Sequence, residues 1–200
     1  MLDLDATLAA LSELSARFAK EEQALNALDA AVGDGDHGST MLRGMRAGEA
    51  AVLGGAAQTP GAAFVLMANA FQKATGGAGG TLFSSIFRGI GDAAGDVEAI
   101  DDATLGVGLG KAAATVARLG RVRVGGKTML DALAPAAAAL EAGGTAADAV
   151  EASRAGCEAT REMRASQGRA RFVSEGGLGH VDPGARSVVI ITETLARAFG

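Results

Sequence analysis

A glycine-rich segment near residue 30 brings three aspartates, Asp29, Asp34 and Asp36, within eight positions of the chain. Carboxylates this close repel one another unless a cation lies among them, and their oxygen atoms are ligands that Mg²⁺ accepts. The glycines between them permit the tight turns that would direct the side chains to one point. A helix is expected to start at residue 39, where its first amide groups could bind an anion. The segment predicts a metal site beside a phosphate site, with an acidic surface loop that caps a helix as the alternative.

An EF-hand calcium loop is the first familiar motif that this segment resembles. The sixth position counted from Asp34 is Ser39 instead of glycine, and the twelfth is Met45 instead of a bidentate glutamate. Both differences remove features that the calcium loop requires. The segment is therefore not an EF-hand.

A phosphate-binding P-loop is imitated by residues 120–128, which end in Gly126-Lys127-Thr128. Five residues stand where the motif has four, and the preceding segment has helical periodicity instead of strand periodicity. Phosphates are therefore expected to be held mainly through metal ions and helix N-termini.

Apolar residues recur at helical spacing along the whole chain, and glycine pairs separate most of these segments. The pattern predicts an all-α domain with helices at 4–28, 39–53, 60–75, 80–94, 102–119, 127–141, 146–164 and 183–198. Many small side chains, including 30 glycines, predict closely packed helices. We expect a single bundle or helical barrel.

Several predicted helices carry recognisable start signals. Thr59-Pro60 and Asp182-Pro183 place a side-chain acceptor at the N-cap and proline at the first helical position, and Thr145 precedes an alanine-rich run. Pro135 falls inside the sixth segment and could kink it. The β-branched run 188–192 is short and belongs to a helix-length pattern, so it is assigned to the last helix.

The composition excludes several classes of protein. With 200 residues, 48% hydrophobic and 20% charged, the chain is too apolar for disorder and too short for a nucleotide-binding half plus a substrate-binding half. The net charge of −5 and the absence of Trp and Tyr argue against nucleic acid. No apolar run is long enough to cross a membrane, and the N-terminal segment lacks signal-peptide features. The single Cys157 cannot form an internal disulfide, so the cytoplasm is the expected location.

Five segments of the chain, taken in order, resemble the successive motifs of the nucleotide-binding L subunit of dihydroxyacetone kinases. They are Asp29 with residues 33–38, and residues 75–83, 126–131, 168–170 and 179–185. The resemblance spans residues 1–200 as one domain. It implies a barrel of about eight antiparallel helices with the nucleotide at one end.

The resemblance also implies roles for the acidic segment. Asp29, Asp34 and Asp36 correspond to ligands of two Mg²⁺ ions that bridge the nucleotide phosphates, and His37 joins them as a candidate catalytic residue. Three carboxylates shared between two ions leave coordination positions for phosphate oxygens and water. The alternative for His37 is a hydrogen-bonding role at the start of a helix.

A larger set corresponds to nucleotide contacts in the family. The implied contacts are His37, Gly38, Ser39 and Thr40 at the phosphates, Ala78 and Gly79 along the site, Gly120 and Met129 near the base and ribose, Arg169 at a phosphate, and Asp182, Pro183 and Gly184 at the start of the last helix. Taken alone, Met129 suits a core position and Asp182 an N-cap. Many relatives have serine where Gly79 stands, and Arg171 also departs from the usual pattern.

The resemblance implies the ADP-binding subunit of a phosphoenolpyruvate-dependent dihydroxyacetone phosphotransferase. A phosphocarrier M subunit would phosphorylate bound ADP, and the ATP formed would phosphorylate dihydroxyacetone held by a K subunit. Whether two copies of this chain form a homodimer is an open question at this point. The alternatives are an ATP-dependent kinase module for dihydroxyacetone or another short ketose, and a metal-stabilised binding or regulatory module without turnover. A related domain occurs in fatty-acid kinases, where threonine typically replaces the equivalent of His37.

Overall fold

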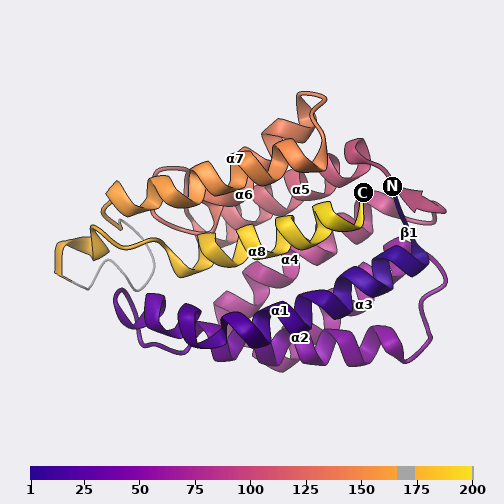
Figure 1. The fold of residues 1–200 in the computed structure, drawn as a ribbon, viewed down its shortest axis with the longest axis horizontal. Coiled ribbons are helices and arrows are strands. Elements are labelled where there is room, and N and C mark those ends of the chain that lie inside the picture. Colours follow the sequence, from indigo (N-terminus) through magenta and orange to yellow (C-terminus); the bar gives the residue numbers. More distant parts are fainter. Residues whose placement is uncertain (166–173, 200) are drawn as a thin grey trace.

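Helices account for most of residues 1–165 and 174–199, the part of the chain that the computed structural model describes (Figure 1). Within these residues eight α-helices confirm the predicted all-α class. Their bounds are α1 Leu4–Ala30, α2 His37–Leu53, α3 Pro60–Thr75, α4 Gly77–Ala94, α5 Asp102–Gly120, α6 Leu130–Glu141, α7 Ala146–Ala159 and α8 Pro183–Ala198.

The helices form a closed barrel because each packs on its neighbours in sequence and α1 also packs on α8. Their apolar faces meet inside the ring, where the side chains of Phe18, Phe64, Phe71 and Phe87 are completely buried. Burial of these large rings is a main source of stabilisation in a chain otherwise rich in small residues.

Glycines let neighbouring helices approach closely, as the composition predicts. A Cβ atom added at Gly89 of α4 would lie only 2.4 Å from the carbonyl oxygen of Gly108 of α5. The reverse substitution at Gly108 would place Cβ 2.6 Å from Cα of Ile90. Backbone therefore packs on backbone at this helix crossing.

The predicted caps are present at three helix starts. Thr59 Oγ1 accepts a hydrogen bond from the amide of Ala62 at 3.1 Å, and Thr145 forms a reciprocal capping box with Asp148. Asp182 caps α8 in the same way, as described below. These side chains satisfy amide groups that the first helical turn leaves without partners.

Several local features differ from the expected pattern or extend it. α2 starts at His37 instead of residue 39, and α4 starts at Gly77 instead of residue 80. The sixth helix starts at Leu130 instead of residue 127, because Lys127 has a left-handed backbone with φ +61°. α7 ends at Ala159 instead of residue 164 and is followed by the short 3₁₀ helices η1 (Thr160–Glu162) and η3 (Ser174–Gly177). Pro135 lies within α6, which stays continuous from Leu130 to Glu141.

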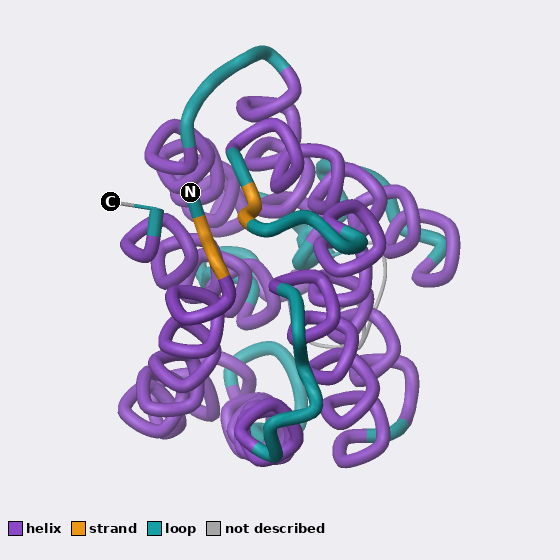
Figure 2. Tube along the Cα trace, turned by 90° about the vertical axis from the view of Figure 1, so that its right-hand side faces the viewer, coloured by secondary structure: helices purple, strands orange, loops and turns teal. Residues whose placement is uncertain are grey.

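A two-residue ladder that the sequence pattern does not predict closes one end of the barrel (Figure 2). β1 (Leu2–Asp3) pairs antiparallel with β2 (Ala99–Ile100), and Leu2 lies opposite Ile100. The two chain ends meet at the same end of the barrel, where the N-terminal amine of Met1 donates to the carbonyl of Phe199 at 3.4 Å (Figure 1).

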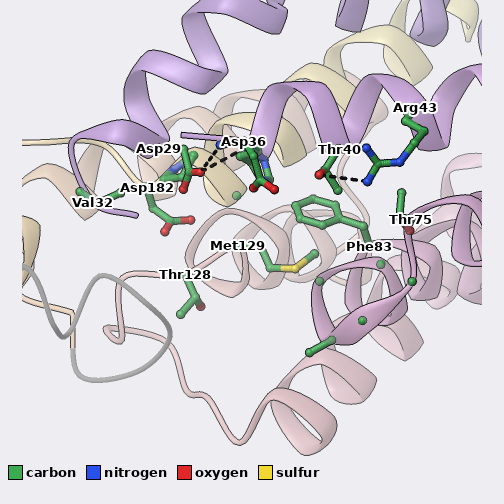
Figure 3. Close-up of a pocket in the computed structure, with 18 of the residues that line it drawn as sticks. Asp29, Val32, Asp36, Thr40, Arg43, Thr75, Phe83, Thr128, Met129 and Asp182 are labelled. Carbon is green, nitrogen blue, oxygen red and sulfur yellow. Dashed lines mark hydrogen bonds between the residues drawn. The ribbon is translucent and has the colours of Figure 1, made fainter. Parts of the chain in front are cut away.

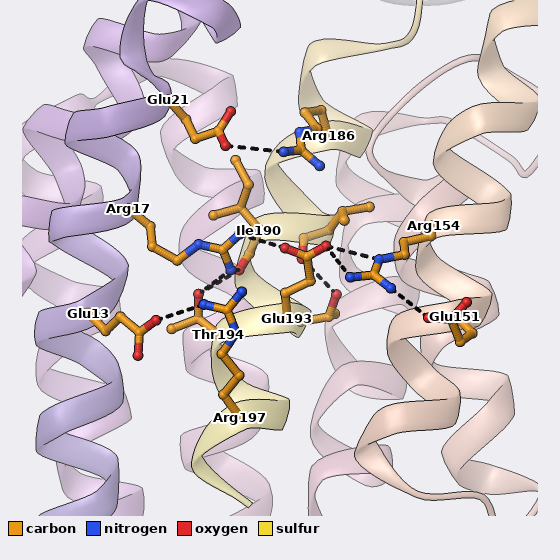
Figure 4. A network of polar contacts seen from close by, with 12 residues as sticks. Glu13, Arg17, Glu21, Glu151, Arg154, Arg186, Ile190, Glu193, Thr194 and Arg197 are labelled. Carbon is orange, nitrogen blue, oxygen red and sulfur yellow. Dashed lines mark hydrogen bonds and ion pairs between the residues drawn. The ribbon is translucent and has the colours of Figure 1, made fainter. Parts of the chain in front are cut away.

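An ion-pair network joins three helices along the outside of the barrel (Figure 4). Glu193 of α8 accepts from Arg17 of α1 at 2.6 Å and from Arg154 of α7 at 2.8 Å. Burial alone would raise the pKa of Glu193, but the hydrogen bonds and charges of the two arginines outweigh it and hold the pKa below 4.5. The carboxylate is therefore ionised at neutral pH and fastens α1 and α7 to α8.

Among the described residues, no helix combines the length and the apolar character that crossing a lipid bilayer requires.

Candidate functional site

The acidic segment between α1 and α2 folds back on the end of α1. Asp29 Oδ2 accepts hydrogen bonds from the amides of Asp36 at 3.0 Å and His37 at 3.2 Å. One carboxylate oxygen from each of Asp29, Asp34 and Asp36 lies within 4.8 Å of the others. The structure therefore brings the three predicted metal ligands together.

The donor set suits Mg²⁺. All three side chains offer hard carboxylate oxygens, and Asp34 and Asp36 are exposed, so water and ligand oxygens can reach the same point. Mg²⁺ takes few protein ligands and retains other coordination positions for water or phosphate. These residues could hold one or more such ions.

The start of α2 is held against α1 by close contacts. A Cβ atom at Gly38 would lie 2.1 Å from the carbonyl oxygen of Glu22, so only glycine fits there. The amide of Ser39 donates to Asn26 Oδ1 at 3.1 Å, and Ser39 Oγ donates to Glu22 at 2.9 Å. Gly38 and Ser39 therefore support the acidic segment from the α1 side and do not line the cavity beside it.

The half-buried His37 side chain reaches from the start of α2 to α8. Its Nε2 lies 2.8 Å from Ser187 Oγ, and its ring packs on Phe83 with centroids 5.5 Å apart. Burial lowers the pKa of His37 to about 4, although the Asp29 charge and a hydrogen bond to the Pro183 backbone oppose this shift. The imidazole is therefore neutral at pH 7 and connects α2 to α8. This contact agrees with the alternative of a hydrogen-bonding role at the start of a helix. The catalytic role of His37 stays a prediction.

A cavity of about 530 Å³ opens beside the acidic cluster (Figure 3). Residues from four parts of the chain line it. The first part contributes Asp29, Val32, Asp36, His37, Thr40 and Arg43, and the second contributes Thr75 to Gly80 and Phe83. The third is Lys127 to Met129, and the fourth is Asp182 to Gly184. The volume suits a small ligand. Acidic and basic side chains both face it, as binding of an anion together with a cation requires.

The glycine-rich start of α4 forms one wall of this cavity. Gly76 has φ +62°, which turns the chain sharply between α3 and α4 and is favoured in glycine. No side chain among residues 1–165 and 174–199 caps α4, so the amide groups of its first turn can bind water or an anionic ligand. Ala78 and Gly79 lie in this wall, as predicted.

The opposite side of the cavity is formed by Met129 and by the start of α8. Met129 is 6% exposed and offers an apolar surface, while Asp182 Oδ2 accepts from the Ala185 amide at 2.7 Å as the N-cap of α8. Burial raises the pKa of Asp182 to about 7, and the Ala185 hydrogen bond opposes this shift. Asp182 therefore lines the cavity, as the resemblance implies, and also caps α8, as the sequence alone suggests.

Some predicted residues have other positions. Gly120 ends α5 beside Val122 and Leu82 and is not among the cavity-lining residues. Asp34 belongs to the acidic cluster without lining the cavity. Arg169 and Arg171 lie outside the described residues.

Several cavity residues were not among the predicted site residues. Arg43 donates to the Ala74 carbonyl at 3.2 Å and to Thr40 Oγ1 at 3.3 Å, which places a cation at the cavity mouth (Figure 3). Arg43 lies six residues after His37, where α2 begins, and no motif marks it. Lys127, Thr128 and Phe83 lie within the segments that resemble the family motifs. In these segments the sequence predicted nucleotide contacts for Met129 and Gly79 but not for these three residues.

Comparison with known proteins gives related chains of two lengths. The DAK2 domain pattern matches residues 31–197. The chain is 30% identical over 199 residues to the PTS-dependent dihydroxyacetone kinase ADP-binding subunit DhaL of Lactococcus lactis, with 98% of this chain and 97% of that protein aligned. It is 33% identical over 201 residues to D-erythrulose kinase of Mycolicibacterium smegmatis, with 94% of this chain and 34% of that protein aligned.

A solved structure has the same fold. The dihydroxyacetone kinase from C. freundii, crystallised with AMP-PNP and Mg²⁺, matches with a TM-score of 0.72 and 28% identity over 96% of this chain and 33% of that one. The chain spans about one third of the length of this kinase and of the D-erythrulose kinase.

Proposed function

We propose a function from one premise, which is that the chain belongs to the DAK2 domain family. The proposal is that residues 1–200 act as one nucleotide-binding domain in a cytoplasmic kinase, the ADP-binding subunit of a phosphoenolpyruvate-dependent dihydroxyacetone phosphotransferase. A phosphocarrier M subunit supplies the phosphoryl group, and a K subunit holds the dihydroxyacetone that receives it. The likeness to the Lactococcus lactis ADP-binding subunit, 30% identical over 199 residues, supports this proposal.

One observation carries the proposal: among the described residues, three carboxylates lie within 4.8 Å of one another, and two of them line a cavity whose far wall is an uncapped, glycine-rich helix start. Carboxylates suit a cation and free helical amides suit a phosphate, so the two features together suit a magnesium nucleotide.

Each part of the site then has a distinct task. When bound, Mg²⁺ neutralises charge on nucleotide phosphates, which phosphoryl transfer requires. Asp29, Asp34 and Asp36 would hold two such ions, and the amides at the start of α4 would orient the phosphates. Met129 would provide an apolar surface for the adenine. Positioning and charge neutralisation suffice for this reaction, so the chain needs no nucleophilic side chain.

A second candidate function is an ATP-dependent kinase module for a short ketose. The likeness to D-erythrulose kinase favours it, because that relative shares 33% identity over 94% of this chain. In this alternative ATP exchanges freely at the same cavity, and the ketose is bound by another domain or subunit.

The deciding experiment begins with the purified chain after exhaustive desalting, when the nucleotide that it retains is measured. Transfer of label from γ-labelled ATP is then followed with the dihydroxyacetone-binding subunit, with and without the phosphorylated carrier, and with dihydroxyacetone or erythrulose as acceptor. We expect retained ADP, little sustained turnover on free ATP, and turnover restored by the carrier. Rapid multiple turnover on ATP alone would favour the second candidate, and no transfer with every partner present would favour a binding or regulatory module.

A further inference from the structure

Lys127 is an unusual residue because its side chain is buried beside the cavity. It is only 2% exposed, whereas lysine is seldom buried unless its charge has partners. Its Nζ donates to the carbonyl oxygen of Thr160 at 2.6 Å and to that of His180. The ammonium group therefore joins two positions that lie 33 and 53 residues further along the chain.

Both carbonyls belong to a structure that we call the neck, formed by residues 160–165 and 174–182 between α7 and α8. Its two sides are bonded to each other, since the amide of Gly179 donates to the Arg161 carbonyl at 2.8 Å and Arg161 donates back to the Gly179 carbonyl at 3.1 Å. Lys127 bonds to one carbonyl on each side, so it fixes the neck as a unit.

The neck leads directly into one wall of the cavity. The amide of Asp182 donates to Thr160 Oγ1 at 2.9 Å, and Asp182 then caps α8. Because Lys127 holds the carbonyls of Thr160 and His180, it restrains the residues on both sides of this contact. The position of Asp182, Pro183 and Gly184 thus depends on where Lys127 is anchored.

The backbone of Lys127 is itself anchored to the adjoining Met129 segment of the cavity lining, where a Cβ atom added at Gly184 would lie 3.3 Å from Met129 Cβ. Asp131 accepts hydrogen bonds from the amides of Gly125 and of Thr128, the latter at 2.7 Å, and these bonds hold Lys127 between them at φ +61°. A left-handed backbone is uncommon for lysine and persists where surrounding bonds enforce it. Thr128 and Met129 follow immediately and line the cavity.

The charge of Lys127 is supported at a distance. Burial lowers the pKa of Lys127, while the charges of Asp182, Asp131 and Glu162 raise it and that of Arg161 opposes them. Within residues 1–165 and 174–199, no carboxylate forms an ion pair with its Nζ. The direct partners of this cation are therefore the two neck carbonyls.

We propose that Lys127 is a positioning residue for the bound nucleotide, fixing the Met129 segment of the cavity lining relative to the adjoining Asp182–Gly184 segment. This inference rests on the proposed nucleotide site. It predicts that Lys127 controls how slowly nucleotide leaves the cavity, without itself binding a phosphate or the metal ions.

The test is a stopped-flow measurement of fluorescent ADP release, with excess Mg²⁺ and unlabelled ADP as the chase. Lys127→Met removes both hydrogen bonds while keeping a side chain of similar length, and Lys127→Gln retains a shorter neutral donor. We expect release to be about ten- to a hundredfold faster in Lys127→Met, as expected for loss of hydrogen bonds from a charged group, and intermediate in Lys127→Gln. Lys111→Met is the matched control, because exposed Lys111 also donates to a backbone carbonyl, that of Asp92, outside the cavity.

Two further measurements separate positioning from general stability. Mn²⁺ binding to the nucleotide-free protein, followed by electron paramagnetic resonance, should be unchanged in both variants, and release is compared well below each melting temperature. Release within twofold of wild type in a folded Lys127 variant would overturn the inference, and Lys127→Gln decides the matter if Lys127→Met does not fold. Failure of the wild type to bind magnesium ADP would instead overturn the proposed function and, with it, this inference.

Discussion

Replacing Gly38 by alanine should separate α1 from α2 and displace the acidic segment. The added Cβ would lie 2.1 Å from the Glu22 carbonyl oxygen and 2.9 Å from Asn26 Oδ1, whereas ordinary contacts begin at 3.4 Å. The helices must therefore move apart by about 1 Å, because the nearest atom is backbone and cannot rotate away. Overpacking of this kind costs about 1–3 kcal/mol.

For a domain of this size, that loss corresponds to a melting temperature about 2–12 °C lower. Urea unfolding followed by circular dichroism measures the free energy directly. Mg²⁺ affinity should fall as well, because the amide of Asp36 is bonded to Asp29 at the end of α1.

Gly79→Ala is the matched control, because a Cβ atom at Gly79 would have no neighbour within 4 Å in the described part of the chain and the residue has no positive φ. Its free energy of unfolding should be unchanged or raised by up to about 1 kcal/mol. Equal stability of the two variants would refute the close-contact argument for Gly38.

Three other predictions concern the metal ligands, the ligand and the ion-pair network. Asp34→Asn or Asp36→Asn should lower phosphoryl transfer by several orders of magnitude while the helical circular dichroism persists; activity within about tenfold of wild type, a loss of about 1.4 kcal/mol, would contradict the metal role. Magnesium ADP should raise the melting temperature of nucleotide-free protein, since a ligand at a hundred times its dissociation constant adds about 2.7 kcal/mol, and an unchanged temperature at saturation would count against the site. Glu193→Gln should cost about 1–3 kcal/mol at pH 7, between the values for surface and buried ion pairs. Because the folded pKa of Glu193 lies below its ordinary value of 4.5, this advantage of the wild type should shrink as the pH falls below 4.5 and through the folded pKa. A difference in the free energy of unfolding that does not shrink as the pH is lowered below 4.5 would contradict the assignment.

The helices were predictable because their positions depend on local signals. Thr59-Pro60 and Asp182-Pro183 specify helix starts through their own side chains and fixed φ angles, and both starts agree with the structure. The acidic cluster was also predictable, because Asp29, Asp34 and Asp36 are close in sequence and glycines allow them to converge.

Features that depend on distant contacts were not predictable. Lys127 is surrounded by hydrogen-bond acceptors from residues 160 and 180, so its sequence neighbours gave no sign that it would be buried. The same holds for the pairing of Leu2 with Ile100 and for the contact between His37 and Ser187. Each needs a tertiary partner that helical periodicity does not identify.

Both chain ends lie at the end of the barrel away from the cavity, so a segment attached to either one must span the length of the barrel to reach the cavity. α1 runs for 27 residues from the end where Met1 and Phe199 meet to the end that carries Asp29, a length of about 40 Å at 1.5 Å per residue. A tether attached to either end must therefore contain at least about 12 fully extended residues before its cargo can reach the cavity. Shorter tethers give an effective concentration near zero at the cavity of the same molecule, so their cargo would serve a neighbouring copy instead.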